Sequence, residues 1–129
     1  MCKIYNKLSE TLFVGYKVAL TDKYGHYYSP FTGIRYEKGK VKKVDANSLK
    51  TKYRTDEKIE YTEGMIGMTG VFAKHVEANY IYDYFTRHHP EYKFSLLEMT
   101  LTGDLYDAKM GDRYNTVIGN NIYKLKKIK

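Results

Sequence analysis

The stretch Phe94–Leu101, FSLLEMTL, decides the fold class of this chain. Successive side chains of a β-strand point to opposite faces, so a strand here would separate its residues into two sets. One face would carry Ser95, Leu97, Met99 and Leu101, and the other Phe94, Leu96, Glu98 and Thr100. The stretch therefore predicts a sheet strand in which one acid, Glu98, interrupts an otherwise apolar sequence.

An amphipathic helix is predicted just before this strand, over Lys74–His88. Val76, Tyr80 and Tyr84 recur at every fourth position, which places them on one face of a helix. Pro90 comes shortly after and closes the helix, because proline cannot continue it.

Turn signals divide the remaining chain into β-prone segments. Asp22–Gly25 separates Leu12–Leu20 from His26–Ser29, and this arrangement predicts a β-hairpin. Gly119–Asn121 separates two further β-prone segments. It predicts a second turn, since Gly and Asn tolerate the positive φ angles of tight hairpins.

Length and composition fit one globular domain. A chain of 129 residues with 43% hydrophobic and 29% charged residues can bury a single core. We therefore expect one domain over residues 1–129, of the α+β class. It would hold a mainly antiparallel sheet of about five to seven short strands and one main helix at about 74–88.

Positive charge is concentrated in two regions. The formal net charge is +7, and Arg35–Lys58 holds nine Lys or Arg residues against four Asp or Glu residues. The C-terminal segment adds Lys124, Lys126, Lys127 and Lys129. Residues 41–58 are rich in lysine and short of large apolar residues, which predicts a basic mobile loop. Such regions fit a phosphate-bearing or acidic partner, although solvated lysine faces are also common.

Fifteen tyrosines accompany this charge, and tyrosine can stack on a nucleic-acid base or pack in a core. Aromatic and basic residues interleave from Tyr24 to Tyr36, which favours a surface for RNA or DNA. Tyrosine also forms strands readily, so the same residues suit the core of a small sheet. The candidate partner-binding residues are Tyr27, Tyr28, Arg35, Tyr36, Lys38, Lys40, Lys42, Lys43, Lys52 and Arg54.

The sequence disfavours several kinds of site. Cys2 is the only cysteine, so an internal disulfide is impossible and a reducing, cytoplasmic location is expected. No apolar run is long enough to span a membrane, so no membrane partner is expected. The four histidines lack the spacing of a metal site, and no phosphate-binding glycine motif or nucleophile elbow occurs. We therefore expect neither a metal nor a cofactor.

Short motifs in the first third of the chain carry a family resemblance. They are Gly15–Val18 (GYKV), Tyr27–Gly33 (YYSPFTG), Tyr36 and Gly39. The pattern resembles small uncharacterised proteins encoded by bacteriophages and bacterial mobile elements. The resemblance implies an accessory protein that binds and blocks a host protein or nucleoprotein with an acidic surface, for example a defence nuclease. Such blocking, as by an anti-CRISPR protein, would need no catalysis.

The order of elements also resembles that of small ADP-ribosyltransferases: an opening strand, a Gly-aromatic strand before the helix, then a strand bearing an acid. This likeness implies that Tyr16, Phe72 and Tyr80 would cradle nicotinamide adenine dinucleotide. Glu98 would then orient the attacking hydroxyl or stabilise the ribosyl cation. The alternative for Glu98 is a surface carboxylate on the wet face of the sheet. A blocking protein, an enzyme and a direct nucleic-acid binder thus stay open as functions.

Overall fold

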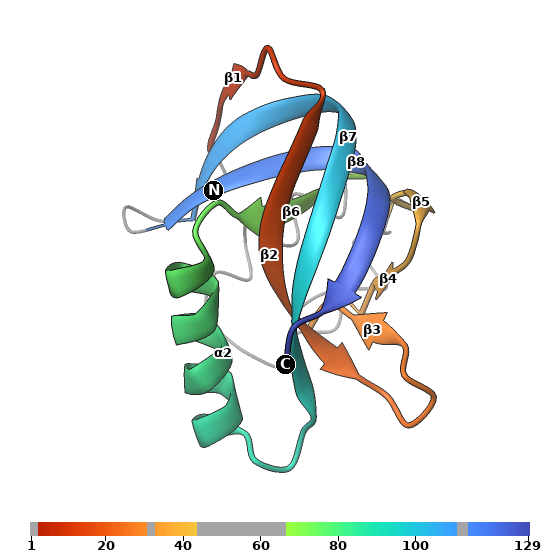
Figure 1. Ribbon diagram of the computed structural model, residues 1–129, viewed down its shortest axis with the longest axis vertical. Helices are drawn as coiled ribbons and strands as arrows, with labels where there is room; N and C mark the ends of the chain where they lie inside the picture. Colours follow the sequence, from red (N-terminus) through yellow and green to blue (C-terminus); the bar gives the residue numbers. More distant parts are fainter. Residues whose placement is uncertain (1–2, 31–32, 44–66, 111–113) are drawn as a thin grey trace.

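The structure is a computed structural model that describes residues 3–30, 33–43, 67–110 and 114–129 (Figure 1). Its elements are β1 (Lys3–Lys7), β2 (Leu12–Thr21), β3 (Tyr27–Tyr28), β4 (Arg35–Tyr36), β5 (Gly39–Lys40), β6 (Thr69–Phe72), α2 (His75–His88), β7 (Phe94–Met110) and β8 (Tyr114–Lys127). Within the described residues there are eight strands in one sheet and one helix, which confirms the predicted α+β class.

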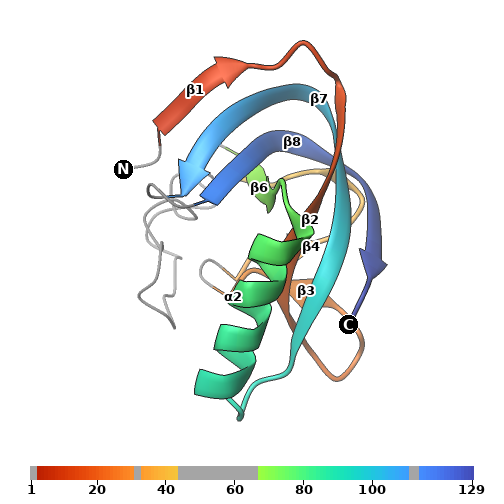
Figure 2. The same cartoon turned by 60° about the vertical axis from the view of Figure 1, so that its left-hand side comes forward.

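Four of the strands close the sheet into a small barrel. The strand order is β1-β7-β8-β6-β2-β3-β4, with β5 added to β8, and β2 also pairs with β7. Strands β7, β8, β6 and β2 therefore form a closed ring, in which each pair of neighbours is antiparallel. Figure 2 shows β7 and β8 bending together across the top of the view, with α2 along the lower part of the barrel.

The two faces of β7 pack into two different cores. The barrel core contains Ala19, Tyr36, Val41, Val71, Leu97, Met99, Leu101, Leu105, Val117 and Ile122. The core beneath α2 contains Val18, Phe72, Ala78, Phe85, Phe94 and Leu96. The alternation predicted for Phe94–Leu101 is confirmed, because its odd-numbered apolar residues enter the barrel while Phe94 and Leu96 pack beneath the helix.

The predicted helix and the first predicted hairpin are also present. The helix begins one residue later than expected, and Arg87 and His88 occupy its last turn. The Arg87 guanidinium there suits the negative C-terminal end of the helix dipole. In the hairpin, β2 and β3 pair Leu20 with Tyr28, and Gly25 in the turn has a φ of 80°. Glycine adopts this left-handed conformation without steric cost.

The turn predicted at Gly119–Asn121 is wrong, because β8 continues through these residues. A Cβ atom on Gly119 would lie 2.7 Å from Leu105 Cδ2, so glycine here permits close packing. Asn121 donates a hydrogen bond from its amide nitrogen to Thr102 Oγ1 at 2.7 Å, across the ladder with β7. Pairing with β6 and β7 thus overrides the local turn signal.

This continuity changes the expected strand lengths. Strand β7 has 17 residues and β8 has 14, so the two central strands are long rather than short. Both curve around the barrel, and their ladder shifts register between Thr100 and Leu101 and again between Thr102 and Leu105. Bulges of this kind bend a strand, which allows so long a ladder to follow a closed sheet.

Candidate functional site

The pairing of β5 with β8 brings Lys38, in the first basic region, to the start of the C-terminal one, whereas Lys42 and Lys43 lie beyond the opposite end of this antiparallel ladder. Lys40 on β5 lies opposite Asn121 on β8. The Val41 amide extends this contact by donating a hydrogen bond to the Asn120 carbonyl at 2.7 Å. Segments far apart in the sequence thus become neighbours, and Figure 1 shows β5 beside the second half of β8.

Seven exposed lysines on these two segments are called here the lysine surface. They are Lys38, Lys40, Lys42, Lys43, Lys124, Lys126 and Lys127. None of them forms an ion pair with a carboxylate in the described part of the chain. By contrast, Lys7 pairs with Asp104 at 3.2 Å, and Lys129 with Asp83 at 3.9 Å. Lys126 lies directly opposite Glu98 in the β7–β8 ladder, which offsets part of its charge. The charge of the other six lysines is left to attract an anion from solution.

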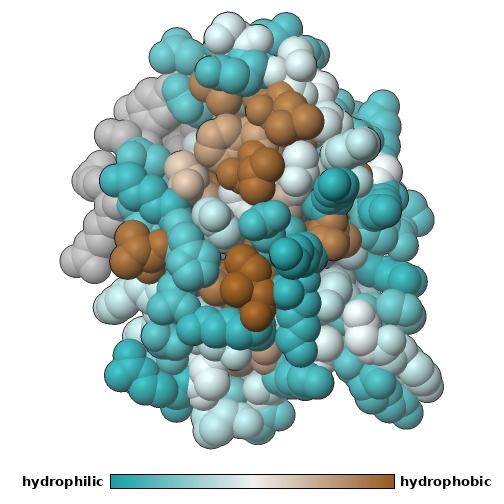
Figure 3. All heavy atoms as spheres, in the orientation of Figure 1, coloured by the Kyte–Doolittle hydropathy of each residue, from teal (hydrophilic) through white to brown (hydrophobic). Residues whose placement is uncertain are grey.

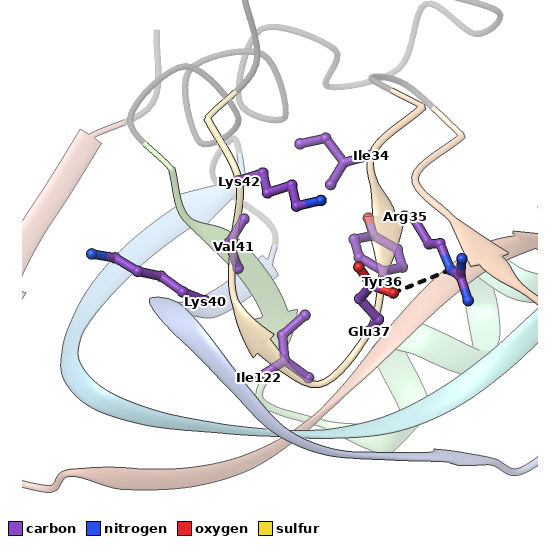
Figure 4. Close-up of a pocket in the computed structure, with 8 residues that line it drawn as sticks. All are labelled: Ile34, Arg35, Tyr36, Glu37, Lys40, Val41, Lys42 and Ile122. Carbon is purple, nitrogen blue, oxygen red and sulfur yellow. Dashed lines mark ion pairs between the residues drawn. The ribbon is translucent and has the colours of Figure 1, made fainter.

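A pocket of about 310 Å³ opens beside β4 and β5 (Figure 4). Its lining residues are Ile34, Arg35, Tyr36, Glu37, Lys40, Val41, Lys42 and Ile122. Three of these residues, Tyr36, Val41 and Ile122, also belong to the barrel core. The pocket therefore has an apolar base that continues into the interior of the barrel.

The polar side chains of the pocket differ in how freely they can meet a ligand. Arg35 is engaged, since its Nε lies 3.4 Å from Oε2 of Glu37. Figure 4 shows Lys42 extending toward the Ile34 side of the pocket, while Lys40 points away from it. An apolar base beside an unpaired ammonium suits a flat group that carries a negative charge.

The tip of the β2–β3 hairpin is organised by Asp22. Its Oδ1 accepts hydrogen bonds from the backbone amides of Tyr24 and His26, each at 2.9 Å. Its Oδ2 accepts one from the Tyr28 hydroxyl at 3.1 Å and lies 3.4 Å from Nδ1 of His26. Desolvation opposes ionisation, but these hydrogen bonds prevail and lower the pKa of Asp22. Desolvation and the bond to Asp22 raise the pKa of Tyr28.

The tyrosines predicted to bind a partner divide between surface and core. Tyr36 is only 3% exposed and belongs to the barrel core, with Lys17 Nζ 5.7 Å from its ring centroid. Tyr27 is half-buried and packs against the same core. Tyr28 is half-buried and bonded to Asp22. The burial of Tyr36 supports the interpretation that this tyrosine serves the core.

The predicted basic residues lie mainly at the surface. Lys38, Lys40, Lys42 and Lys43 belong to the lysine surface, and Arg35 is exposed. Lys52 and Arg54 lie outside the described residues, as does residue range 44–58 of the predicted loop. Val41 does not fit a mobile loop, because β5 holds it against β8 and it is buried in the barrel core.

Tyr123 is a candidate binding residue that the sequence pattern misses. Its side chain is 53% exposed, next to Lys124 of the lysine surface. Thr100 lies opposite Lys124 and Leu101 lies opposite Ile122, so Tyr123 is the extra residue of a β-bulge. A bulge breaks the two-residue period of a strand, and so alternation along the sequence could not assign this side chain to a face.

The residues of the predicted nucleotide site lie partly in register. Tyr16 lies opposite Phe72 on β6 and opposite Glu98 on β7. Directly opposed residues share a face of the sheet, so Tyr16 and the half-buried Glu98 are side by side on the outside of the barrel. The His75 ring contacts Tyr16 edge-on, with 5.0 Å between centroids. Phe72 is buried beneath α2, whereas Tyr80 is exposed on the helix.

Apolar side chains are exposed on the same outer face. Leu12 and Val14 of β2 are exposed, and Figure 3 shows hydrophobic atoms gathered over the upper part of β2. Val14 lies opposite Thr100, which in turn lies opposite Lys124. Leu12 and Val14 therefore form an exposed apolar strip on β2, which is separated from Lys124 on β8 by the single strand β7.

Comparison with protein-family models, curated proteins and solved structures found no match. In the described part of the chain, no helix is both long and apolar enough to cross a membrane.

Proposed function

We propose that this protein is a binding protein that captures a negatively charged partner, a host protein or a nucleoprotein, and blocks it without catalysis. The observation that carries the proposal is the antiparallel β5–β8 ladder, which ends at the Gly39–Ile122 pair and so brings Lys38 to the start of the C-terminal lysine segment, near Tyr123 and Lys124. The resemblance to phage and mobile-element proteins supports a bacterial host cell as the setting and a defence nuclease as one example of the partner.

The lysine surface suits capture because its ammonium groups are exposed and make no ion pair with a described carboxylate. A cluster of one sign of charge raises the encounter rate with an acidic surface, and this attraction weakens as salt screens it. The adjacent pocket, with its base of Tyr36, Val41 and Ile122, offers an apolar contact that salt would not weaken.

Affinity capture from a bacterial lysate tests the proposal. The test variant carries Lys38→Glu and Lys124→Glu, both on the lysine surface. The control carries Lys23→Glu and Lys74→Glu, which are exposed but lie in the turn between β2 and β3 and just before α2. Both variants change the net charge equally. We expect wild type and control to retain the partner and the test variant to release it. If the partner is a protein, this result should be the same with and without added nuclease.

Two outcomes oppose the proposal. Equal retention by both variants would show that the lysine surface does not hold the partner. Equal loss would show that total charge, rather than this surface, controls capture. Loss of the partner only after nuclease treatment would identify nucleic acid as the captured component.

A second candidate function is a nucleotide-using enzyme centred on Glu98. The observation that favours it is the register of Tyr16 and Glu98, with the His75 ring packed against Tyr16. Incubation with labelled nicotinamide adenine dinucleotide tests it. If wild type and Glu98→Gln consume or transfer the label equally, including not at all, the enzymatic function is rejected.

A further inference from the structure

The β-bulge in β8 gives Tyr123 a different environment from the other exposed tyrosines. Because it lacks a partner on β7, its side chain is not held within a cross-strand row. Its neighbours in the chain are Ile122, buried in the barrel core, and Lys124, exposed on the lysine surface. Lys38 and Tyr123 both lie one residue beyond the β5–β8 ladder, which ends at the Gly39–Ile122 pair.

Other exposed tyrosines have their rings occupied or lie elsewhere. Tyr24 is 72% exposed, but Lys23 Nζ lies 5.2 Å from its ring centroid. Tyr92 packs near Phe94, with 6.5 Å between centroids. Tyr80 is 55% exposed on α2, which packs against β2 and β7 rather than against β5. Tyr123 makes no ring or cation–π contact with any described residue, so its ring is open to a ligand within the lysine surface.

We infer that Tyr123 is a base-stacking site for single-stranded nucleic acid, whose phosphates contact the flanking lysines. This inference rests on the proposed function and narrows its partner to the nucleic-acid part of a nucleoprotein. A phenol ring stacks on any base, and lysines that follow the backbone supply sequence-independent attraction. The bases of a duplex are already stacked on one another, so an isolated exposed ring favours a single strand.

The choice of nucleic acid over an acidic protein comes from the combination of groups. An acidic protein would satisfy the lysines and leave no specific requirement for an aromatic ring. A nucleic-acid strand alternates negative phosphates with flat apolar bases, and lysines around one open ring match that alternation. The backbone that carries the ring belongs to a β-strand of the barrel, so its position does not depend on binding of the nucleic acid.

Fluorescence anisotropy with labelled oligo(dT), and with a labelled duplex for comparison, tests the inference. Tyr123→Leu removes the ring but keeps an apolar side chain, and we expect its affinity for oligo(dT) to fall about 5-fold to 100-fold. Tyr123→Phe keeps the ring and should bind like wild type. Tyr80→Leu is the matched control, because Tyr80 is almost as exposed as Tyr123 but lies on α2. It should also bind like wild type.

Labelled heparin separates this inference from the proposed function, because it carries charge without bases. We expect Tyr123→Leu to bind heparin as wild type does, and Lys38→Glu with Lys124→Glu to lose both heparin and oligo(dT). If the lysine variant loses both ligands while Tyr123→Leu keeps full affinity for oligo(dT), the stacking site is wrong and the charged surface stands. If the lysine variant binds both ligands normally, the surface itself is wrong. Equal weakening of heparin and oligo(dT) by Tyr123→Leu would also overturn the stacking role.

Discussion

Lys40 lies directly opposite Asn121 in the antiparallel ladder between β5 and β8. The ladder is only two residues long, and two-residue pairings contribute little by themselves. What holds it is the next residue, Val41, which is buried in the barrel core and donates its amide to the Asn120 carbonyl. The position of the first lysine-rich segment therefore depends on one apolar side chain.

The first prediction concerns this anchor. Val41→Ala leaves the charge unchanged, and we expect it to lower the free energy of unfolding by about 1–3 kcal/mol and to weaken capture of the partner. Val14→Ala is the control, because Val14 is exposed and should change stability by about 0.5 kcal/mol or less. Urea unfolding and the lysate capture measure the two effects. Full capture by Val41→Ala would contradict the role of the anchor.

The second prediction concerns the close contact between Gly119 and Leu105. Gly119→Ala would put a Cβ atom 2.7 Å from Leu105 Cδ2, so we expect a loss of about 1–3 kcal/mol in the free energy of unfolding. Leu105→Ala should cost about 2–5 kcal/mol, because Leu105 is fully buried.

The double variant is the informative measurement. The new methyl group would occupy part of the space that the leucine leaves, so the double variant should lose less stability than the sum of the single losses. Strict additivity in urea unfolding would show that the two residues do not share this space.

The third prediction concerns the acid dependence of the hairpin tip. The pKa of Asp22 is lowered from its ordinary value of 3.8, so its ionised form stabilises the folded state above that value. This contribution is lost as pH falls through the lowered pKa. We expect wild type to exceed Asp22→Asn in free energy of unfolding at neutral pH, and the difference to shrink as pH falls below about 4. A difference that stays constant down to about pH 3 would contradict it.

Local sequence patterns were enough to predict the first part of β7, the helix and the hairpin of β2 and β3. The two-residue alternation of Phe94–Leu101 assigned its apolar residues to two faces, and these faces became the barrel core and the core beneath α2. The fourfold spacing of Val76, Tyr80 and Tyr84 located the helix but not its buried face, because Val76 and Tyr80 are exposed while Ala78 and Phe85 are buried. The hairpin at Asp22–Gly25 is stabilised by bonds within the turn itself, and so its residues were enough to predict it.

Long-range pairing determines what the sequence could not show. Gly119–Asn121 has the composition of a turn, but β7 pairs with this segment on one side, while β6 pairs with Gly119 and β5 with Asn121 on the other. The pairing of Lys40 with Asn121 could not be predicted either, because the two residues are far apart in the sequence and no local pattern links β5 to β8. The charge of the lysine segments could be predicted, whereas the approach of Lys38 to the C-terminal segment, and the exposure of Tyr123 there, required the fold.

The C-terminal lysines of β8 also affect aggregation, because one edge of this strand is open. Beyond Ile122, residues of β8 pair with β7 on one side, and no described strand pairs with the other. An uncovered strand edge invites β-pairing between molecules, and charged side chains discourage it. Lys124, Lys126 and Lys127 therefore also guard the protein against aggregation. Replacement of these lysines by glutamate would preserve that protection, whereas replacement by apolar residues would leave an edge that can pair with other molecules.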